Sequence, residues 1–480
     1  MTAGEGTSLM HQVISSFAWQ GFGRISERLM RFGVNIILTR IITAGDFGLF
    51  VAIMAPIAAV ETFTYLSSGP FIIQNDRGRE SGLLRTVLFM NALRGILLCA
   101  LLLSFAPLVA EYFNRSEMRP LLFVMALQPL VAGFMSPRLH VLEKDLKFKP
   151  VALNGLVASS VGSTVALSVA IQAPSVWALI YGKLAFTVVA LVGSWVIAPM
   201  NPFRAPDLSV FADFRRYALG AFGIPLLIMA IGQAPALLIG RLDSMETLGV
   251  FSMTYRLAEL PVFLSLSVIG SVLIPTYSRI QSDVVRLRTV WLRAWSMIGL
   301  TTMPLALLVA WSGDALPQFV WGSKYVTDRP LVPVLALVGF LSAMLAITGP
   351  LFWGVGRPGI DRMMQFVRVL LVYALGVPLA IMFGAEGVGW ALAFGLLGAL
   401  SVGISGALRV VGSSVGILVR SSMPFILVTL ALYGILGCAD VLFSPSGFER
   451  LIWSGTIASL LGIVFTGLIL LRRDDIKRFL

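Results

Sequence analysis

The chain has 480 residues, of which 57% are hydrophobic and 12% are charged, and its mean hydropathy is +0.89. Long apolar runs recur from end to end, which excludes a set of soluble domains and predicts an all-α polytopic membrane protein. The net charge of +12 is spread over short loops rather than gathered into one patch, so nucleic acid is not an expected partner.

The few residues with metal or thiol chemistry lie apart. Cys99 and Cys438 both fall in apolar runs, and His11 and His140 are not close in sequence to a cysteine or to paired carboxylates. We therefore expect no disulfide, no metal site and no cofactor. The first eleven residues lack a basic region and a cleavage site, so we expect the first hydrophobic segment to direct insertion.

Apolar stretches of about 20 residues, ended by charges or by Pro and Gly, predict about fourteen transmembrane helices. The first six spans are predicted at 12–38, 47–73, 83–109, 120–141, 151–172 and 175–198. The next six are predicted at 216–240, 248–275, 289–312, 331–352, 359–382 and 386–408, and the last two at 421–441 and 452–471.

The basic residues predict the orientation of these spans. With a cytoplasmic N-terminus, 22 of the 36 basic residues fall in the even-numbered connections and the C-terminal tail, and seven fall on the opposite side. Positive residues are enriched in cytoplasmic loops, so both termini of this multi-pass protein are expected in the cytoplasm.

Two segments of the chain resemble each other at an offset of 201 residues. ILTRIITAGDFGLFVAI near residue 37 and LLIGRLDSMETLGVFSM near residue 237 pair Arg40 with Arg241 and Gly48 with Gly249. Internal similarity of this kind indicates transporter halves, here with the same orientation because six spans separate the copies. We expect two six-helix lobes around a central cavity, with 1–200 forming the N-lobe, 201–415 the C-lobe and 416–480 two additional C-terminal spans.

The first predicted span carries charges inside its apolar sequence. In FGRISERLMRFG, residues 22–33, the side chains of Arg24, Glu27, Arg28 and Arg31 project within an arc of about 100°, which Asn35 continues. The stripe has three interpretations: an interfacial helix over residues 12–31, an internally paired structural cluster, or the lining of a wet cavity. We favour the cavity, because too few apolar residues would remain to cross and one Glu cannot neutralise three Arg.

Other spans carry isolated charges that we expect to face the same cavity. The candidate anion-binding residues for a pyrophosphate group are Arg24, Arg28, Arg31, Asn35, Arg94, Lys183, Arg256 and Arg368. For each of the last four, a snorkelling side chain or a local ion pair is the alternative. The candidate ion-coupling residues are Glu61, Glu27 and Glu259, and Glu61 stands out because it lies in mid-span without a basic neighbour one turn away.

The two copies differ at the charged stripe. At the offset of 201, the four charged positions of the first span correspond to Pro225, Ile228, Met229 and Gly232. The predicted seventh span instead carries Pro225 and Pro235, which we expect to bend it.

Three stretches resemble the polysaccharide transporter family, the Wzx-type flippases of lipid-linked oligosaccharides in the MOP superfamily. They are LTRIITAGDFGLFVAI at 38–53, SPRLHVLEKDLKFK at 136–149, and LLIGRLDSMETLGVFSMTYRLAELP at 237–261 with LIPTYSRI at 273–280. The resemblance implies a two-lobed bundle that flips an undecaprenyl-pyrophosphate-linked sugar unit by alternating access. It implies a lipid-linked oligosaccharide substrate, contact with membrane lipid, and polymerase or export machinery as candidate partners.

Three other functions compete with this interpretation. A lipid II flippase would meet the same anionic headgroup, whereas a multidrug/cation antiporter would need a net acidic cavity. An enzyme would need an extramembrane platform with catalytic acids or bases, and the longest predicted outer connection, 313–330, has only four charged residues. We therefore expect a transporter and no enzyme.

Overall fold

The computed structural model describes residues 3–64, 68–203, 207, 211, 223–259, 273–326, 330–444 and 446–471. Side chains at 3–18, 20, 22, 24 and 462–471 lie outside the described part. All regular structure in these ranges is helical, which confirms the all-α fold. The chain divides into two compact units, unit 1 over Met1–Met229 and unit 2 over Ala230–Leu480.

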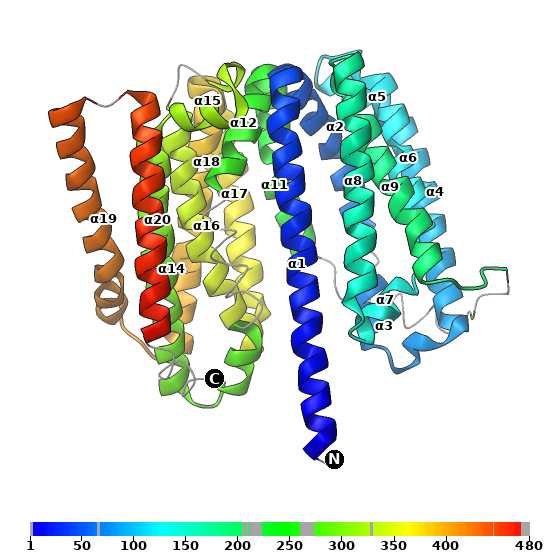
Figure 1. Cartoon of the computed structure of the whole chain (residues 1–480), viewed down its shortest axis with the longest axis horizontal. Helices are drawn as coiled ribbons and strands as arrows, with labels where there is room; N and C mark the ends of the chain where they lie inside the picture. The colour runs from blue at the N-terminus through cyan, green and yellow to red at the C-terminus, as the bar shows by residue number, and fades with distance from the viewer. Residues whose placement is uncertain are drawn as a thin grey trace. The chain divides into compact units, whose positions relative to one another are not determined.

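The helices of unit 1 alternate between long membrane-crossing helices and short segments (Figure 1). They are α1 (Ala3–Ile41), α2 (Ala44–Phe63), α3 (Ser68–Gln74), η1 (Asp76–Arg79), α4 (Ser81–Tyr112), α5 (Met118–Met125), α6 (Leu127–Gly133), α7 (Leu139–Lys144), α8 (Phe148–Gln172) and α9 (Val176–Ile197).

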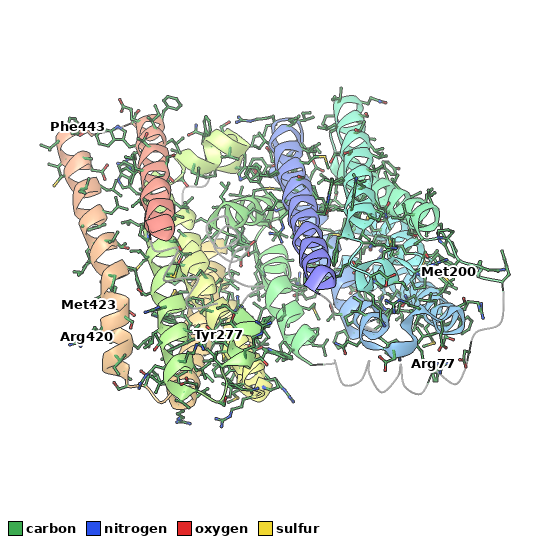
Figure 2. The ribbon with its side chains drawn as sticks, turned by 60° about the horizontal axis from the view of Figure 1, so that its bottom comes forward. Arg77, Met200, Tyr277, Arg420, Met423 and Phe443 are labelled. Carbon is green, nitrogen blue, oxygen red and sulfur yellow. The ribbon has the colours of Figure 1, made fainter. Side chains whose placement is uncertain are left out.

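Unit 2 begins inside α11 (Ile224–Leu242) and contains most of the remaining long helices. The others are α12 (Met245–Ala258), α14 (Val284–Ser312), α15 (Ala315–Trp321), η2 (Ser323–Tyr325), α16 (Leu331–Gly354), α17 (Pro358–Phe383), α18 (Ala385–Val410), α19 (Val415–Phe443) and α20 (Gly447–Leu471). Figure 2 shows the length of α19, with Arg420 and Met423 near one end and Phe443 at the other.

Ten helices in the described ranges are long and apolar enough to cross a membrane. They correspond to the predicted spans 2, 3, 5–7 and 9–13. The count of fourteen stays a prediction: α1 carries the charged stripe, the described part of span 8 is the 14-residue α12, and α20 includes side chains outside the description. The chain is a multi-pass helical membrane protein.

The single predicted span at 120–141 is wrong. The structure has three short helices there, α5, α6 and α7, and α5 ends at Met125. Pro129 lacks an N–H and its ring clashes with the carbonyl of the residue four positions earlier, Met125, which favours a break after α5. Pro137, between α6 and α7, disfavours helical structure for the same reason.

The predicted second span contains two helical segments. α2 stops at Phe63 with Thr64 as its C-cap, and α3 starts at Ser68. The hydroxyl of Thr64 donates to the Val60 carbonyl at 2.9 Å. Glu61 lies in the last turn of α2, near the middle of Ala44–Gln74, the stretch that is long and apolar enough to cross a membrane.

The turns of the internal repeat have equivalent caps. Thr43 caps α2 by accepting a hydrogen bond from the Asp46 N–H, and Ser244 caps α12 by accepting one from the Thr247 N–H. Both pairs are related by the offset of 201 residues. Capping by a Ser or Thr hydroxyl satisfies one of the free N–H groups at a helix start, so each sequence forms a helix–turn–helix at the same place.

Of the two prolines expected to bend α11, only Pro235 lies inside the helix. Pro225 lies in the first turn, where a missing N–H costs nothing, whereas Pro235 lies inside a helix that continues to Leu242.

The core of unit 1 depends on close helix approach between α8 and α9. A Cβ atom added at Gly162 would lie 2.8 Å from the Gly182 carbonyl oxygen and 2.9 Å from the Phe186 Cβ. A Cβ atom at Gly182 would lie 2.7 Å from the Ala166 Cβ. In a membrane, small residues let two helices approach and gain packing energy that hydrophobicity alone does not supply.

We expect Gly162→Leu to destabilise unit 1. The added side chain must push α8 away from α9, and overpacking of this kind costs about 1–3 kcal/mol. The melting temperature of the purified protein in detergent measures the effect. Gly434→Leu is the matched control, because a Cβ atom at Gly434 on α19 would have no neighbour within 4 Å. Equal melting temperatures for the two variants would contradict the close-packing argument.

Candidate substrate-binding site

The contact between α1 and α8 fixes the rotation of the charged helix. A Cβ atom at Gly23 would lie 2.6 Å from the Ala152 Cβ, so the two helices nearly touch at this point. One turn later the Glu27 carboxylate lies beside Gly155, and Ser160 donates a hydrogen bond to the Met30 sulfur at 3.4 Å. Residues 23, 27 and 30 therefore form the face of α1 that packs on α8.

The basic residues of the stripe lie next to this face. At about 100° per residue, the positions of Arg24, Arg28, Arg31 and Asn35 follow Glu27 around the helix on one side of the α8 contact. Arg28 and Arg31 are exposed and Asn35 is half-buried. The Arg24 backbone belongs to α1, but its side chain lies outside the described part.

Glu27 forms an ion pair with Arg31, as in the paired-cluster interpretation of the stripe. Its carboxylate lies 3.2 Å from Arg31 Nη2, with 23% of the Glu27 side chain and 53% of the Arg31 side chain exposed. A pair this accessible contributes little to stability, so the guanidinium can exchange its carboxylate for another anion. Because α1 runs without interruption from Ala3 to Ile41, the structure does not support a separate interfacial helix over residues 12–31.

Lys183 extends the charged region onto α9. It is half-buried, and its ammonium interacts electrostatically with Glu61, Arg31 and Glu27. The ammonium also lies 5.4 Å from the centre of the Phe186 ring, a weak cation–π contact. The structure thus brings four predicted residues from α1, α2 and α9 into one electrostatic cluster, which we call the α1 cluster: Glu27, Arg31, Glu61 and Lys183.

Arg94 forms hydrogen bonds to the C-terminal end of α2. Its Nη2 donates to the Glu61 carbonyl at 2.8 Å and its Nε donates to the Thr64 hydroxyl at 2.9 Å. Both acceptors belong to the end of α2, where helical carbonyls lack partners within the helix. Arg94 on α4 therefore caps α2 and positions Glu61.

A second cluster lies in unit 2. Arg368 interacts electrostatically with Glu259 and Tyr255, and Tyr255 is hydrogen-bonded to Glu259. The Arg368 Nε atom is buried and has no hydrogen-bond partner in the described part of the chain. Arg256, one turn before Glu259, is exposed.

Asp361 is a membrane-embedded acid that the sequence reasoning missed. It is 7% exposed and accepts hydrogen bonds from Trp353 Nε1 at 2.9 Å and from Gln365 Nε2 at 3.2 Å. Gln365 Oε1 is buried without a hydrogen-bond partner in the described ranges. The spacing of Asp361, Gln365 and Arg368 is helical, and this signal could have revealed a polar stripe on α17.

The described residues contain no group of three or more His, Cys, Asp or Glu side chains that could hold a metal ion. In unit 1, the chemistry of the site is that of exposed guanidinium groups and one ammonium group near two carboxylates. Such a site can bind a phosphate-type anion by charge-assisted, two-pronged hydrogen bonds.

Several curated proteins are similar to this chain over about three quarters of its length. TuaB of Bacillus subtilis, a teichuronic acid biosynthesis protein, is 24% identical over 79% of this chain and 78% of its own length. WzxC of Escherichia coli, a lipopolysaccharide biosynthesis protein, is 24% identical over the same shares of the two chains. ExoT of Rhizobium meliloti, a succinoglycan biosynthesis transport protein, is 21% identical over 75% of this chain and 72% of its own.

Solved transporters have the same fold. The lipid II flippase MurJ in an inward closed conformation superposes with a TM-score of 0.72 at 13% identity, covering 95% of this chain and 99% of that chain. An inward-facing multidrug resistance MATE transporter of the MOP superfamily gives 0.62 at 15% identity, covering 84% of this chain and 99% of that one.

A family model described as "Polysaccharide biosynthesis protein" matches residues 37–330, more than half of the sequence. The matched region includes the turn after α1, the helices that carry Glu61, Arg94 and Lys183, and the repeated turn before α12. The chain therefore belongs to the polysaccharide biosynthesis protein family.

Proposed function

We propose that this protein is a flippase that moves an undecaprenyl-pyrophosphate-linked oligosaccharide repeat unit across the bacterial inner membrane, with both termini in the cytoplasm. The unit would serve exopolysaccharide, capsule or O-antigen synthesis. The observation that carries the proposal is the basic face of α1, where Arg28 and Arg31 are exposed and Arg31 interacts electrostatically with Lys183 of α9. Membership of the polysaccharide biosynthesis family supports a transported glycan precursor.

Arginine supplies the chemistry that a pyrophosphate requires. A planar guanidinium donates two hydrogen bonds to two phosphate oxygens and keeps its charge at any relevant pH. Arg31 leaves Glu27 when the pyrophosphate binds and returns to it when the substrate departs, so the 3.2 Å ion pair acts as an internal competitor. When no substrate is bound, the carboxylate of Glu27 neutralises part of the positive charge of the site. This pairing lowers the free-energy cost of placing unpaired charges in the membrane.

Glu61 is the residue that we propose for coupling to an ion gradient. It faces the electrostatic field of Lys183, while Arg94 fixes the helix end that carries it. Protonation or cation binding at Glu61 changes the field at Lys183 and thereby the affinity for the anionic substrate. Glu27 acts on the same ammonium and is the second carboxylate of this group; Glu259 and Arg368 form the corresponding proposed pair in unit 2.

A lipid II flippase and a multidrug/cation antiporter are the alternatives on this scaffold. The fold similarity does not separate them, because both the MurJ and the MATE structures are at most 15% identical to this chain. Basic groups outnumber acids on the α1 face, which argues against a cationic drug as substrate. The curated relatives named for teichuronic acid, lipopolysaccharide and succinoglycan favour a lipid-linked oligosaccharide over lipid II. A polysaccharide polymerase and export machinery are candidate partners.

We expect Arg28→Ala to trap lipid-linked repeat units on the cytoplasmic side of the membrane, in cells that lack their own flippase. Loss of a charge-assisted phosphate contact should lower export on the order of ten- to a hundredfold. Arg28→Lys should restore part of it, because an ammonium keeps the charge but not the two-pronged geometry. Quantifying trapped repeat units at matched protein levels checks the result.

Arg420→Ala is the matched control, since Arg420 is an exposed arginine on α19 outside the proposed site. Its export should equal that of the wild type. Normal export by both Arg28 variants would show that the α1 face is structural and would overturn the assignment.

We expect Glu61→Gln to remove the response of transport to an imposed proton or sodium gradient. The amide keeps the shape of the side chain but neither titrates nor carries charge, so it cannot change the field at Lys183. Uptake of a fluorescent lipid-linked substrate by proteoliposomes, with and without the gradient, measures the response. Glu111→Gln, an exposed position at the end of α4, is the control. A gradient response that persists in Glu61→Gln would assign the coupling elsewhere.

A further inference from the structure

A groove in unit 1 lies apart from the α1 cluster. It has a volume of about 720 Å³ and runs between α4, the residue after α6, α9 and the segment that follows α9. This volume is within the range of about 300–1,000 Å³ that is typical of small-molecule sites. The lining residues that matter below are Arg85, Phe89, Ala92, Val192, Trp195 and Val196.

The walls of the groove are apolar and accessible from the outside of the unit. Phe89, Val192 and Val196 are all more than half exposed, so large hydrophobic surfaces remain uncovered by protein. Trp195 donates its Nε1–H to the Phe134 carbonyl at 2.9 Å. Because this bond satisfies the polar atom of the indole, the tryptophan presents a wholly apolar ring to the groove.

The charge of the groove is concentrated at one end. Arg85, in the second turn of α4, is the charged member of the ten lining residues. Near the start of α4, Arg77 of η1 forms ion pairs with Glu80 at 2.8 Å and with Asp207 at 2.9 Å. Figure 2 labels Arg77 and Met200, which belong to the segments that flank this end of the groove.

The charged end of the groove lies at the level expected for a membrane–water interface. The start of α4 follows η1, which Arg79 joins to α7 by an ion pair with Asp145 at 2.6 Å. These short polar segments lie at one end of unit 1, as Figure 1 shows for α3 and α7. In the proposed orientation this end faces the cytoplasm, so Arg85 lies at headgroup level and the apolar walls extend toward the membrane centre.

We propose that this groove binds an anionic phospholipid of the inner leaflet, with one acyl chain between α4 and α9 and the phosphate held by Arg85. Basic pockets between helices at the cytoplasmic side recognise anionic headgroups, and a tryptophan at this level contacts the glycerol region. The lipid is a constituent of the membrane and not the transported substrate. Since α9 carries both Trp195 and Lys183, the occupied groove stabilises the helix on which the ammonium of the α1 cluster is mounted.

Quenching of Trp195 fluorescence by brominated lipid tests the proposal. The wild-type protein is placed in phosphatidylcholine vesicles that contain a small fraction of phosphatidylglycerol with brominated chains, or the same fraction of brominated phosphatidylcholine. Subtracting the signal of Trp195→Phe isolates the contribution of the groove. We expect about fivefold more effective quenching by phosphatidylglycerol, the preference that one basic group gives an anionic lipid.

Three variants locate the interaction. Arg85→Gln should quench equally with both lipids, whereas Arg420→Ala should keep the wild-type preference. Ala92→Phe, which fills the groove, should reduce quenching by either lipid. Since the comparison of the wild type with Trp195→Phe does not use Arg85→Gln, misfolding of Arg85→Gln would leave the proposal testable.

Equal quenching of the wild type by the two lipids would overturn the site, because it would show ordinary annular lipid. Displacement of brominated phosphatidylglycerol by undecaprenyl phosphate at a much lower concentration than by unbrominated phosphatidylglycerol would overturn the assignment to phospholipid and give the groove to the transport substrate. The measurement needs no transport, so its result is independent of the outcome for Arg28.

Discussion

The cost of placing charge in a hydrocarbon layer governs the structure of unit 1. Each arginine or lysine at the centre of a spanning helix costs about 2.5–3.5 kcal/mol on insertion scales, and the chain must offset this cost locally. Arg94 does so by donating to the end of α2, Arg31 by pairing with Glu27, and Lys183 through two carboxylates in its field. These interactions shield the charges to different degrees. Arg94 donates to a backbone carbonyl and a hydroxyl and so holds two helices together, whereas the side chains of Arg28 and Arg31 are exposed.

The sequence predicts the positions of most helices, but it does not predict which side chains on different helices interact. Hydropathy over about 20 residues identified ten spans because length and apolar content are local properties. It failed near Pro129, where the break depends on single residues that an averaged window ignores. The stripe on α1 was predictable from helical spacing, but the pairing of Arg94 with residues 30 and 33 positions earlier was not, since nothing local marks it. Asp361 was overlooked because it opens a helix, where an acid is ordinary; burial under Trp353 makes it unusual.

The two units share a turn but differ in electrostatics. Thr43 and Ser244 cap their helices in the same manner, so the backbone of the repeated turn is retained. In the preceding helices, unit 1 has the charged face of α1 and α11 is apolar up to Arg241. Unit 2 carries its polar groups on α12 and α17 instead, around Glu259 and Arg368. The repeated turn thus joins helices with different charges in the two units.

Asp46 gives unit 1 a mechanical property. One of its carboxylate oxygens accepts from the Thr43 hydroxyl at 2.6 Å, and the other accepts from the Val176 N–H at the start of α9 at 3.0 Å. The turn between α1 and α2 is thereby fastened to the start of α9. Arg28 lies 13 residues before the end of α1, roughly 20 Å along the axis. The charged face of α1 is therefore held from two directions, by Asp46 at the end of the helix and by the α8 contact at Gly23 and Met30.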